Sequence, residues 1–256
     1  MRFSIILFLS LISISTISAQ KQFLQSGPMS GYVTFREAAI WIQTTESAKV
    51  TAVYWSIETP DDKKRTLPVI TARNKAFSTA LVADGLTPGT TYNYQLEINN
   101  RPIELDYPCI IKTPNLWQWR AQPPSFSFLT GSCVYVSETE ADRPGKPYGG
   151  DNHIFQNMAK QDAELMLWLG DNTYYREIDW DSRTGIYYRN THTRSLPELQ
   201  PLLGKMHHYA IWDDHDFGPN DAIGTFYNKD ITLEAFKDFW ANPNYNVSGG
   251  TGISGQ

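Results

Sequence analysis

The chain has 256 residues, 41% of them hydrophobic and 19% charged, with a formal net charge of −5. These values are typical of a folded globular protein of one or two domains and exclude a disordered chain. No block of Lys or Arg stands out, because Lys63, Lys64 and Arg65 directly follow Asp61 and Asp62. The sequence therefore indicates no surface for nucleic acid or for an anionic membrane.

The first residues have the pattern of a secretory signal peptide. Arg2 gives a basic start, residues 3–17 are apolar apart from Ser and Thr, and Ala19 is a small residue ahead of a cleavage point before Gln20. The apolar run is shorter than the ~20 residues that a membrane-spanning helix needs, and no second apolar stretch follows. We expect residues 1–19 to be removed, leaving a secreted or periplasmic protein without a transmembrane segment.

Short alternating apolar runs separated by turn residues fill the stretch from Gln25 to Thr113. Four of these runs occupy residues 39–42, 50–55, 79–82 and 92–96. Their β-branched and aromatic residues and period-two spacing predict an all-β sandwich. Tyr92 follows a Leu and a Pro-Gly turn, as in the tyrosine corner of fibronectin type III and immunoglobulin-like sandwiches. We expect a structural role for Tyr92 and no catalysis in this region.

Beyond residue 125 the pattern changes to strands that alternate with helices. Three continuous apolar runs predict buried strands, at residues 126–131, 165–170 and 209–212. Apolar residues at helical spacing predict helices at 150–162, at 185–206 with a break at Pro197, and at 232–240. This order favours a parallel sheet covered by helices. The sequence thus predicts a β-sandwich domain over residues 20–115 and an α/β domain over 125–256.

Each of the three predicted α/β strands ends in polar residues. These are Ser132 and Cys133 after the first strand, Asp171, Asn172 and Tyr174 after the second, and Asp213, Asp214, His215, Asp216, Asn220 and Asp221 after the third. Ligands of open α/β sheets collect at the carboxyl ends of the strands. Thiol, carboxyl, phenol and imidazole groups from separate strand ends would therefore converge on one rim, as a metal centre requires.

Each motif also has a simpler explanation. The Gly170-Asp171-Asn172 segment alone is typical of a turn, and residues 213–216 could form a solvated acidic loop. Cys133 could form a disulfide with Cys109, the only other cysteine, or pack as a free thiol. The combination of polar motifs at three successive strand ends favours the metal centre over these alternatives.

These motifs, in this order, resemble the alkaline phosphatase D (PhoD-like) family of the metallophosphoesterase superfamily. The matching residues are Ser132-Cys133, Gly170-Asp171 with Tyr174, and Trp212 to Asp216 with Asn220-Asp221. The family carries a small β-sandwich ahead of its catalytic domain, so the resemblance spans nearly the whole mature chain. It implies a fibronectin III/Ig-like β-sandwich followed by an αββα-type metallophosphoesterase domain.

The resemblance also implies a centre that holds ferric iron and calcium, with other divalent metals as alternatives. Asp171 would bridge the two metals, and Cys133 and Tyr174 would bind the iron as thiolate and phenolate. Asp214 would bind the second metal. Thiolate and phenolate suit a trivalent transition metal, whereas carboxylate and amide oxygens suit calcium.

Further roles implied by the resemblance concern the reaction itself. His215 would bind phosphate and protonate the leaving group, acting with Asp171 as the catalytic pair. Asn220 and Asn172 are weaker candidates for metal or substrate binding. The implied enzyme is a monomeric phosphoric ester hydrolase that cleaves phosphate mono- or diesters with a metal-activated hydroxide. The metals would supply the positive potential that this acidic chain lacks.

One part of the family pattern is missing from the sequence. Metallophosphoesterases take further ligands from later Gly-x-His motifs, and the residues beyond Trp240 contain no His. His207 and His208 precede the third predicted strand and are expected to be packing or surface residues. We therefore expect a phosphatase domain that is incomplete at its C-terminus. The alternative function is a secreted β-sandwich binding module with a catalytically inactive phosphatase domain.

Overall fold

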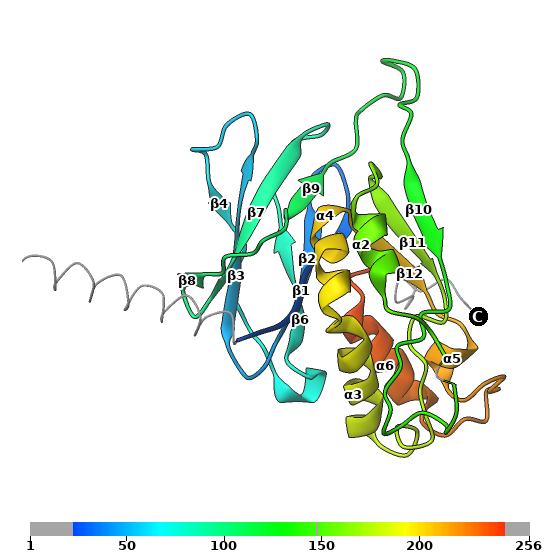
Figure 1. The fold of residues 1–256 in the computed structure, drawn as a ribbon. Coiled ribbons are helices and arrows are strands. Elements are labelled where there is room, and N and C mark those ends of the chain that lie inside the picture. Colours follow the sequence, from blue (N-terminus) through cyan, green and yellow to red (C-terminus); the bar gives the residue numbers. More distant parts are fainter. Residues whose placement is uncertain (1–22, 147, 244–256) are drawn as a thin grey trace, which may run out of the picture.

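The computed structural model describes residues 23–146 and 148–243, in which two antiparallel sheets precede a small parallel sheet with helices (Figure 1). The predicted signal peptide, residues 1–19, lies outside the described residues. Within the described part, no helix is both long and apolar enough to cross a membrane.

The two antiparallel sheets contain nine strands. The first sheet has the order β1-β2-β6, formed by Leu24–Val33, Ala38–Thr44 and Ser78–Ala83. The second has the order β4-β3-β7-β8, with β5 beside β3 and β9 beside β7. Its strands are β3 (Lys49–Ser56), β4 (Lys64–Arg65), β5 (Val69–Ile70), β7 (Thr91–Ile98), β8 (Arg101–Pro102) and β9 (Ile110–Lys112). A 3₁₀ turn, η1 (Arg73–Lys75), precedes β6.

A shared apolar core lies between these two sheets. It includes Ile40 and Leu81 from the first sheet and Val50 and Leu96 from the second, all at most 1% exposed. The Tyr92 hydroxyl accepts a hydrogen bond of 2.8 Å from the backbone N–H of Thr87, five residues upstream. This contact is of the kind that closes a tyrosine corner.

The parallel sheet has the order β10-β11-β12, formed by Phe128–Gly131, Leu165–Leu169 and His207–Ile211. Its helices are α2 (His153–Ala159), α3 (Arg183–Arg194), η2 (Pro197–Leu199), α4 (Gln200–Lys205), α5 (Asp214–Phe217) and α6 (Lys229–Phe239). Proline lacks a backbone N–H, which explains why α3 ends at Arg194 and a 3₁₀ turn begins at Pro197. In Figure 1, α3 and α4 lie between the first antiparallel sheet and the parallel sheet.

Strand β2 is buried along its whole length because both faces of its sheet are covered. Ala38, Ile40 and Ile42 point into the sandwich core, whereas Ala39 and Trp41 pack with the helices of the α/β part. The Trp41 indole N–H donates a 2.8 Å hydrogen bond to the carbonyl of Asp238 in α6. The period-two alternation of strand side chains thus places one strand in two hydrophobic cores. The division into domains 20–115 and 125–256 stays a prediction.

The parallel sheet is covered less evenly than the sequence predicts. Met166 and Trp168 face α2 and α4 and are at most 3% exposed. On the opposite face, Phe128, Leu169 and Ile211 are 50%, 47% and 43% exposed. Within the described residues, helices therefore bury one face of this sheet and leave the other face partly open.

Two buried histidines begin β12, although the sequence analysis places them before the strand. His207 donates from Nδ1 to the carbonyl of Gly31 at 2.8 Å and accepts at Nε2 from the Lys112 N–H at 3.0 Å. His208 accepts at Nδ1 from the Trp168 indole at 2.9 Å and faces the Leu202 carbonyl with Nε2 at 3.0 Å. Each ring uses one nitrogen as an acceptor, so both contact sets require neutral imidazole.

Burial lowers the pKa of His207 to about 4 and that of His208 to about 3, below their ordinary value of 6.5. At pH values between these lowered pKa values and 6.5, the folded protein therefore binds fewer protons than the unfolded chain. The stabilisation is complete above pH 6.5 and is lost as the pH falls toward 4.

We expect the free energy of unfolding to decrease by about 1.4 kcal/mol per pH unit for each of these histidines as the pH falls from about 6 to about 5. Urea denaturation across this range measures the slope. His208→Gln should make the slope shallower, whereas the control His153→Gln, at a side chain that is 63% exposed, should not. Equal slopes for the unaltered protein and both variants would contradict the assignment of His208 as a buried, neutral imidazole.

Candidate metal centre

The register of the parallel sheet brings the three strand ends together. Gly131 of β10 lies opposite Trp168 of β11, which lies opposite Ala210 of β12. The loops that follow therefore begin side by side at one edge of the sheet, as expected of parallel strands. Backbone hydrogen bonds join the first two loops, from the Val134 N–H to the Asp171 carbonyl at 2.8 Å.

The backbone at this edge adopts left-handed conformations that are uncommon outside glycine. The φ angles of Cys133, Gly170 and Asp171 are 60°, 93° and 52°. A Cβ atom added to Gly170 would lie 2.5 Å from the Cβ of Asp213, so only glycine allows the second and third loops to approach so closely. Strained non-glycine residues cluster at functional sites because the surrounding structure holds them in place.

Three acidic or imidazole side chains meet where the second and third strands end. Asp171, Asp214 and His215 each offer one ligand atom, and these atoms all lie within 4.8 Å of one another. All three side chains are partly buried. Two carboxylates and an imidazole at this spacing form a possible metal site, since such groups are common protein ligands for divalent ions.

Cys133 and Tyr174 adjoin Asp171 from the other side. The Tyr174 hydroxyl donates a 2.8 Å hydrogen bond to Asp171 Oδ2, and the Cys133 Sγ atom lies 3.5 Å from the same oxygen. Burial raises the pKa of the Tyr174 phenol, and hydrogen bonding with Cys133 and Asp171 raises it further. Binding of a metal by this phenol would therefore release its proton.

His215 is held by two contacts. Its ring centroid lies 4.1 Å from that of Tyr174, and its backbone N–H points at Asp171 Oδ1 at 3.4 Å. Asn220 bonds to the neighbouring Asp221 side chain at 2.5 Å, and the Asp221 N–H donates to Asp214 Oδ2 at 2.7 Å. The loop after β12 therefore folds back on itself around Asp214.

Asn172 does not join this group. Its side chain is buried and donates to the Ile211 carbonyl at 2.8 Å and to Asp216 Oδ2 at 3.1 Å. These contacts connect β11 to the end of β12 beneath the rim. The structure thus separates Asn172 from Cys133, Asp171, Tyr174, Asp214 and His215, which it brings together.

Asp216 has no separate role in the family resemblance, yet its buried carboxylate connects two of the loops. It accepts hydrogen bonds from the Thr173 N–H at 2.9 Å and from the Asp213 N–H and Asn172 side chain at 3.1 Å each. Burial raises its pKa to about 7, although these donors act in the opposite direction. Asp213 and Asp216 form a capping box at the start of α5. Their spacing of three residues in the sequence is the pattern that indicates such a helix start.

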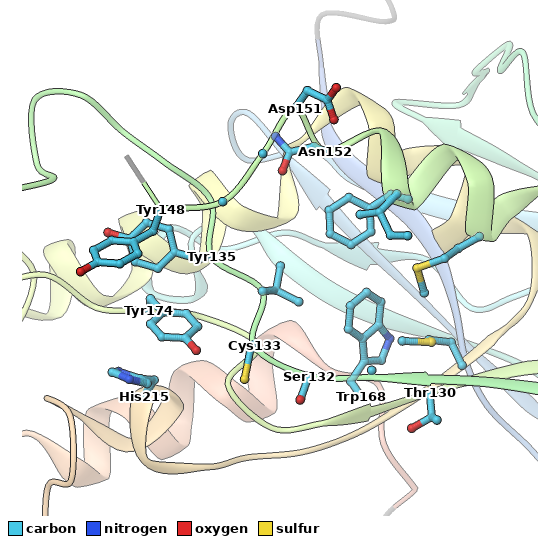
Figure 2. A pocket seen from close by; sticks show the side chains of 18 of the residues that line it. Thr130, Ser132, Cys133, Tyr135, Tyr148, Asp151, Asn152, Trp168, Tyr174 and His215 are labelled. Carbon is cyan, nitrogen blue, oxygen red and sulfur yellow. The ribbon is translucent and has the colours of Figure 1, made fainter. Parts of the chain in front are cut away.

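A cleft of about 1150 Å³ opens beside the site (Figure 2). Cys133, Tyr174 and His215 line one end of it, and Figure 2 shows their side chains facing a common space. The other end is apolar and includes Phe155 and Trp168. The cleft therefore offers polar and apolar surfaces to a bound molecule.

The alternative of a disulfide between Cys109 and Cys133 is wrong. Both cysteines are free: Cys109 is buried just before β9, in the core between the antiparallel sheets, and Cys133 is exposed just after β10. The Cys133 thiol is therefore available to a ligand.

Comparisons with known proteins point to a phosphatase-like fold. A solved structure of PhoD superposes with a TM-score of 0.69 at 18% identity, covering 90% of this chain and 48% of that one. Purple acid phosphatase PPD1 from yellow lupin (Lupinus luteus) seeds gives 0.57 at 15% identity, covering 86% and 42%. The chain thus spans less than half the length of either structure. At these identities the similarity shows the fold alone, which resembles part of PhoD and part of the purple acid phosphatase.

Sequence comparisons add one match. A model for a domain of unknown function, DUF7800, matches residues 21–107, which contain all strands of the antiparallel sheets except β9. No curated protein matches the chain.

Replacing Asp216 tests how the rim is held together. Asp216→Asn puts an amide N–H₂ among N–H donors, so we expect the free energy of unfolding to fall by about 1–3 kcal/mol. Guanidinium denaturation followed by tryptophan fluorescence measures this change. The control Asp162→Asn alters an exposed carboxylate and should leave stability unchanged. Equal stability of the Asp216 variant and the unaltered protein would contradict this role.

Proposed function

We propose that this protein is a metal-dependent phosphoric ester hydrolase of the alkaline phosphatase D type, acting on phosphate mono- or diesters. The observation that carries the proposal is the meeting of Asp171, Asp214 and His215 within 4.8 Å at the carboxyl edge of a parallel sheet. Cys133 and Tyr174 adjoin the same group. The PhoD-like fold gives independent support.

In this proposal Cys133, Tyr174 and Asp171 would hold ferric iron. Asp214 and Asp171 would hold calcium, with other divalent ions as alternatives. The donor chemistry favours this distribution, since thiolate and phenolate suit a trivalent metal and carboxylate suits calcium. When bound, such ions act as Lewis acids toward the phosphate oxygens and acidify water at the site.

The protein's own groups then position the ester and move a proton. His215 lines the cleft and donates a proton to the leaving oxygen, while its ring contact with Tyr174 holds it in place. Asn220 also lines the cleft and orients the substrate through its side chain amide. The apolar end of the cleft excludes water from one side of the ester.

The proposed setting follows from the sequence. The signal-peptide pattern indicates a secreted or periplasmic enzyme, and we propose that it acts as a monomer. With a net charge of −5, the chain itself repels phosphate esters, so the metals supply the attraction.

The purified protein, reconstituted with iron and calcium, should retain both metals and hydrolyse a chromogenic bis-aryl phosphate. Asp171→Asn should lower metal content and reduce turnover by about a hundredfold or more, because it removes the shared ligand. His215→Asn should reduce kcat by about 10²–10⁴-fold, because it removes a proton donor, and should lose less metal than Asp171→Asn, because both carboxylates remain. Elemental analysis and absorbance assays measure the two effects.

The control Asp162→Asn, at an exposed position between α2 and β11, should match the unaltered protein in both assays. A protein that stays metal-free and inactive after reconstitution would refute the proposal. That outcome would favour the alternative, a secreted binding module whose phosphatase-like part is inactive.

A further inference from the structure

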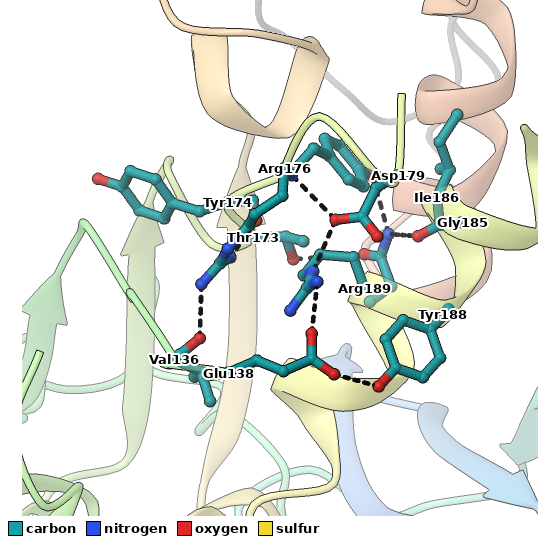
Figure 3. A network of polar contacts seen from close by, with 12 residues as sticks. Val136, Glu138, Thr173, Tyr174, Arg176, Asp179, Gly185, Ile186, Tyr188 and Arg189 are labelled. Carbon is teal, nitrogen blue, oxygen red and sulfur yellow. Dashed lines mark hydrogen bonds and ion pairs between the residues drawn. The ribbon is translucent and has the colours of Figure 1, made fainter. Parts of the chain in front are cut away.

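Arg176 is a buried arginine in the loop that follows β11, with a side chain that is 6% exposed. Its Nε donates to Asp142 Oδ1 at 2.9 Å, and one Nη donates to the Val136 carbonyl at 2.7 Å. The other Nη donates to the carbonyl of Tyr174. Its backbone N–H donates to Asp179 Oδ2 at 2.9 Å. Figure 3 shows the contacts of Arg176 with Val136 and Asp179.

These partners belong to two different loops. Val136 and Asp142 lie in the loop that follows β10 and contains Cys133, whereas Tyr174 lies in the loop that follows β11. One guanidinium group therefore ties together the two loops that carry the thiol and the phenol. The planar fork of arginine suits this task, because its donors point in fixed directions at separate acceptors.

A row of neighbouring, tilted rings makes a second connection from Arg176 to the site. The guanidinium carbon lies 4.1 Å from the ring centre of Tyr135. The Tyr135 ring lies 5.1 Å from that of Tyr174, which lies 4.1 Å from that of His215. Figure 2 shows Tyr135, Tyr174 and His215 in this order. Arg176 thus supports the Tyr174 ring as well as its backbone.

The buried partner of Arg176 is held in its charged form. Burial opposes ionisation of Asp142, but hydrogen bonds from the Glu138 N–H, the Tyr135 hydroxyl and Arg176 outweigh it and lower the pKa. A buried ion pair is seldom more stabilising than apolar residues of the same size, because both charges lose their water. A contribution to stability alone therefore accounts poorly for this pair.

We propose that Arg176 is a positioning residue for metal binding, which fixes Cys133 and Tyr174 at the separation where both can bind one ion. This inference rests on the proposed function for the metal itself. The positioning of the two loops is a property of the protein without metal, and it is tested separately below.

Cobalt(II) titration of the purified protein tests the effect on the site. Absorption by thiolate-to-cobalt charge transfer reports whether Cys133 is a ligand, which a change in stability alone would not alter. The variants are Arg176→Lys, which keeps the charge without the planar fork, and Arg176→Gln with Asp142→Asn, which removes both charges together. We expect both to bind cobalt about tenfold to a hundredfold more weakly and to lose thiolate absorption.

Arg194→Lys is the matched control. Arg194 is also 6% exposed, but it packs 3.8 Å from the Trp240 ring centre, in the core rather than in the two loops. This variant should lose stability and keep the cobalt affinity and the absorption band of the unaltered protein. Arg176 variants that fold and bind cobalt through Cys133 as the unaltered protein does would overturn the inference.

Amide hydrogen exchange of the metal-free proteins separates this inference from the proposed function. Both Arg176 variants should exchange faster over residues 134–142 and 171–179, whereas Arg194→Lys should not. If the Arg176 variants exchange faster but the unaltered protein binds no cobalt, the metal centre is refuted and the loop-positioning role stands. Unchanged exchange in both loops would overturn the positioning role, whether or not cobalt binds.

Discussion

The parallel register of β10, β11 and β12 is the constraint on which the site depends. Gly131, Trp168 and Ala210 are aligned across the sheet, so the loops after the three strands begin at nearly the same level along it. Each following loop must then turn sharply within one or two residues. The left-handed backbone of Cys133 and Asp171 is the result of that turn, and it directs their side chains toward a common centre. A shift of one residue in either pairing would send these side chains to opposite faces.

The first antiparallel sheet provides the support behind this arrangement. Because β2 alternates its side chains between two cores, this one strand packs against both the second antiparallel sheet and the helices beside the parallel sheet. His207 adds a polar connection, since its ring bonds to both Gly31 and Lys112 while lying in β12. Displacement of the sandwich would therefore disturb the strand that precedes Asp214 and His215. The amino-terminal part contributes rigidity to the site, although its residues do not line it.

Beneath the rim, buried polar groups take the place of an apolar core. Asp216 joins the second and third loops, and Arg176 joins the first and second. Such groups lose hydration when buried, and they hold geometry only when every partner is present. The two residues connect the three loops in sequence, so the positions of Cys133, Tyr174 and His215 depend on one another. A site built in this way is sensitive to changes in residues that never contact a ligand.

The sequence alone determined where strands and polar strand ends occur, because apolar runs and their interruptions are local properties. The predicted runs at 126–131, 165–170 and 209–212 correspond to β10, β11 and β12 with shifts of at most two residues. Only the tertiary structure decided which polar residues face the rim. Asn172 follows Asp171 directly, yet its side chain points away from the rim toward the Ile211 carbonyl. Side-chain direction depends on backbone angles and on distant partners. The same reason explains why the separation of Cys109 from Cys133 and the role of Arg176 could not be predicted from spacing.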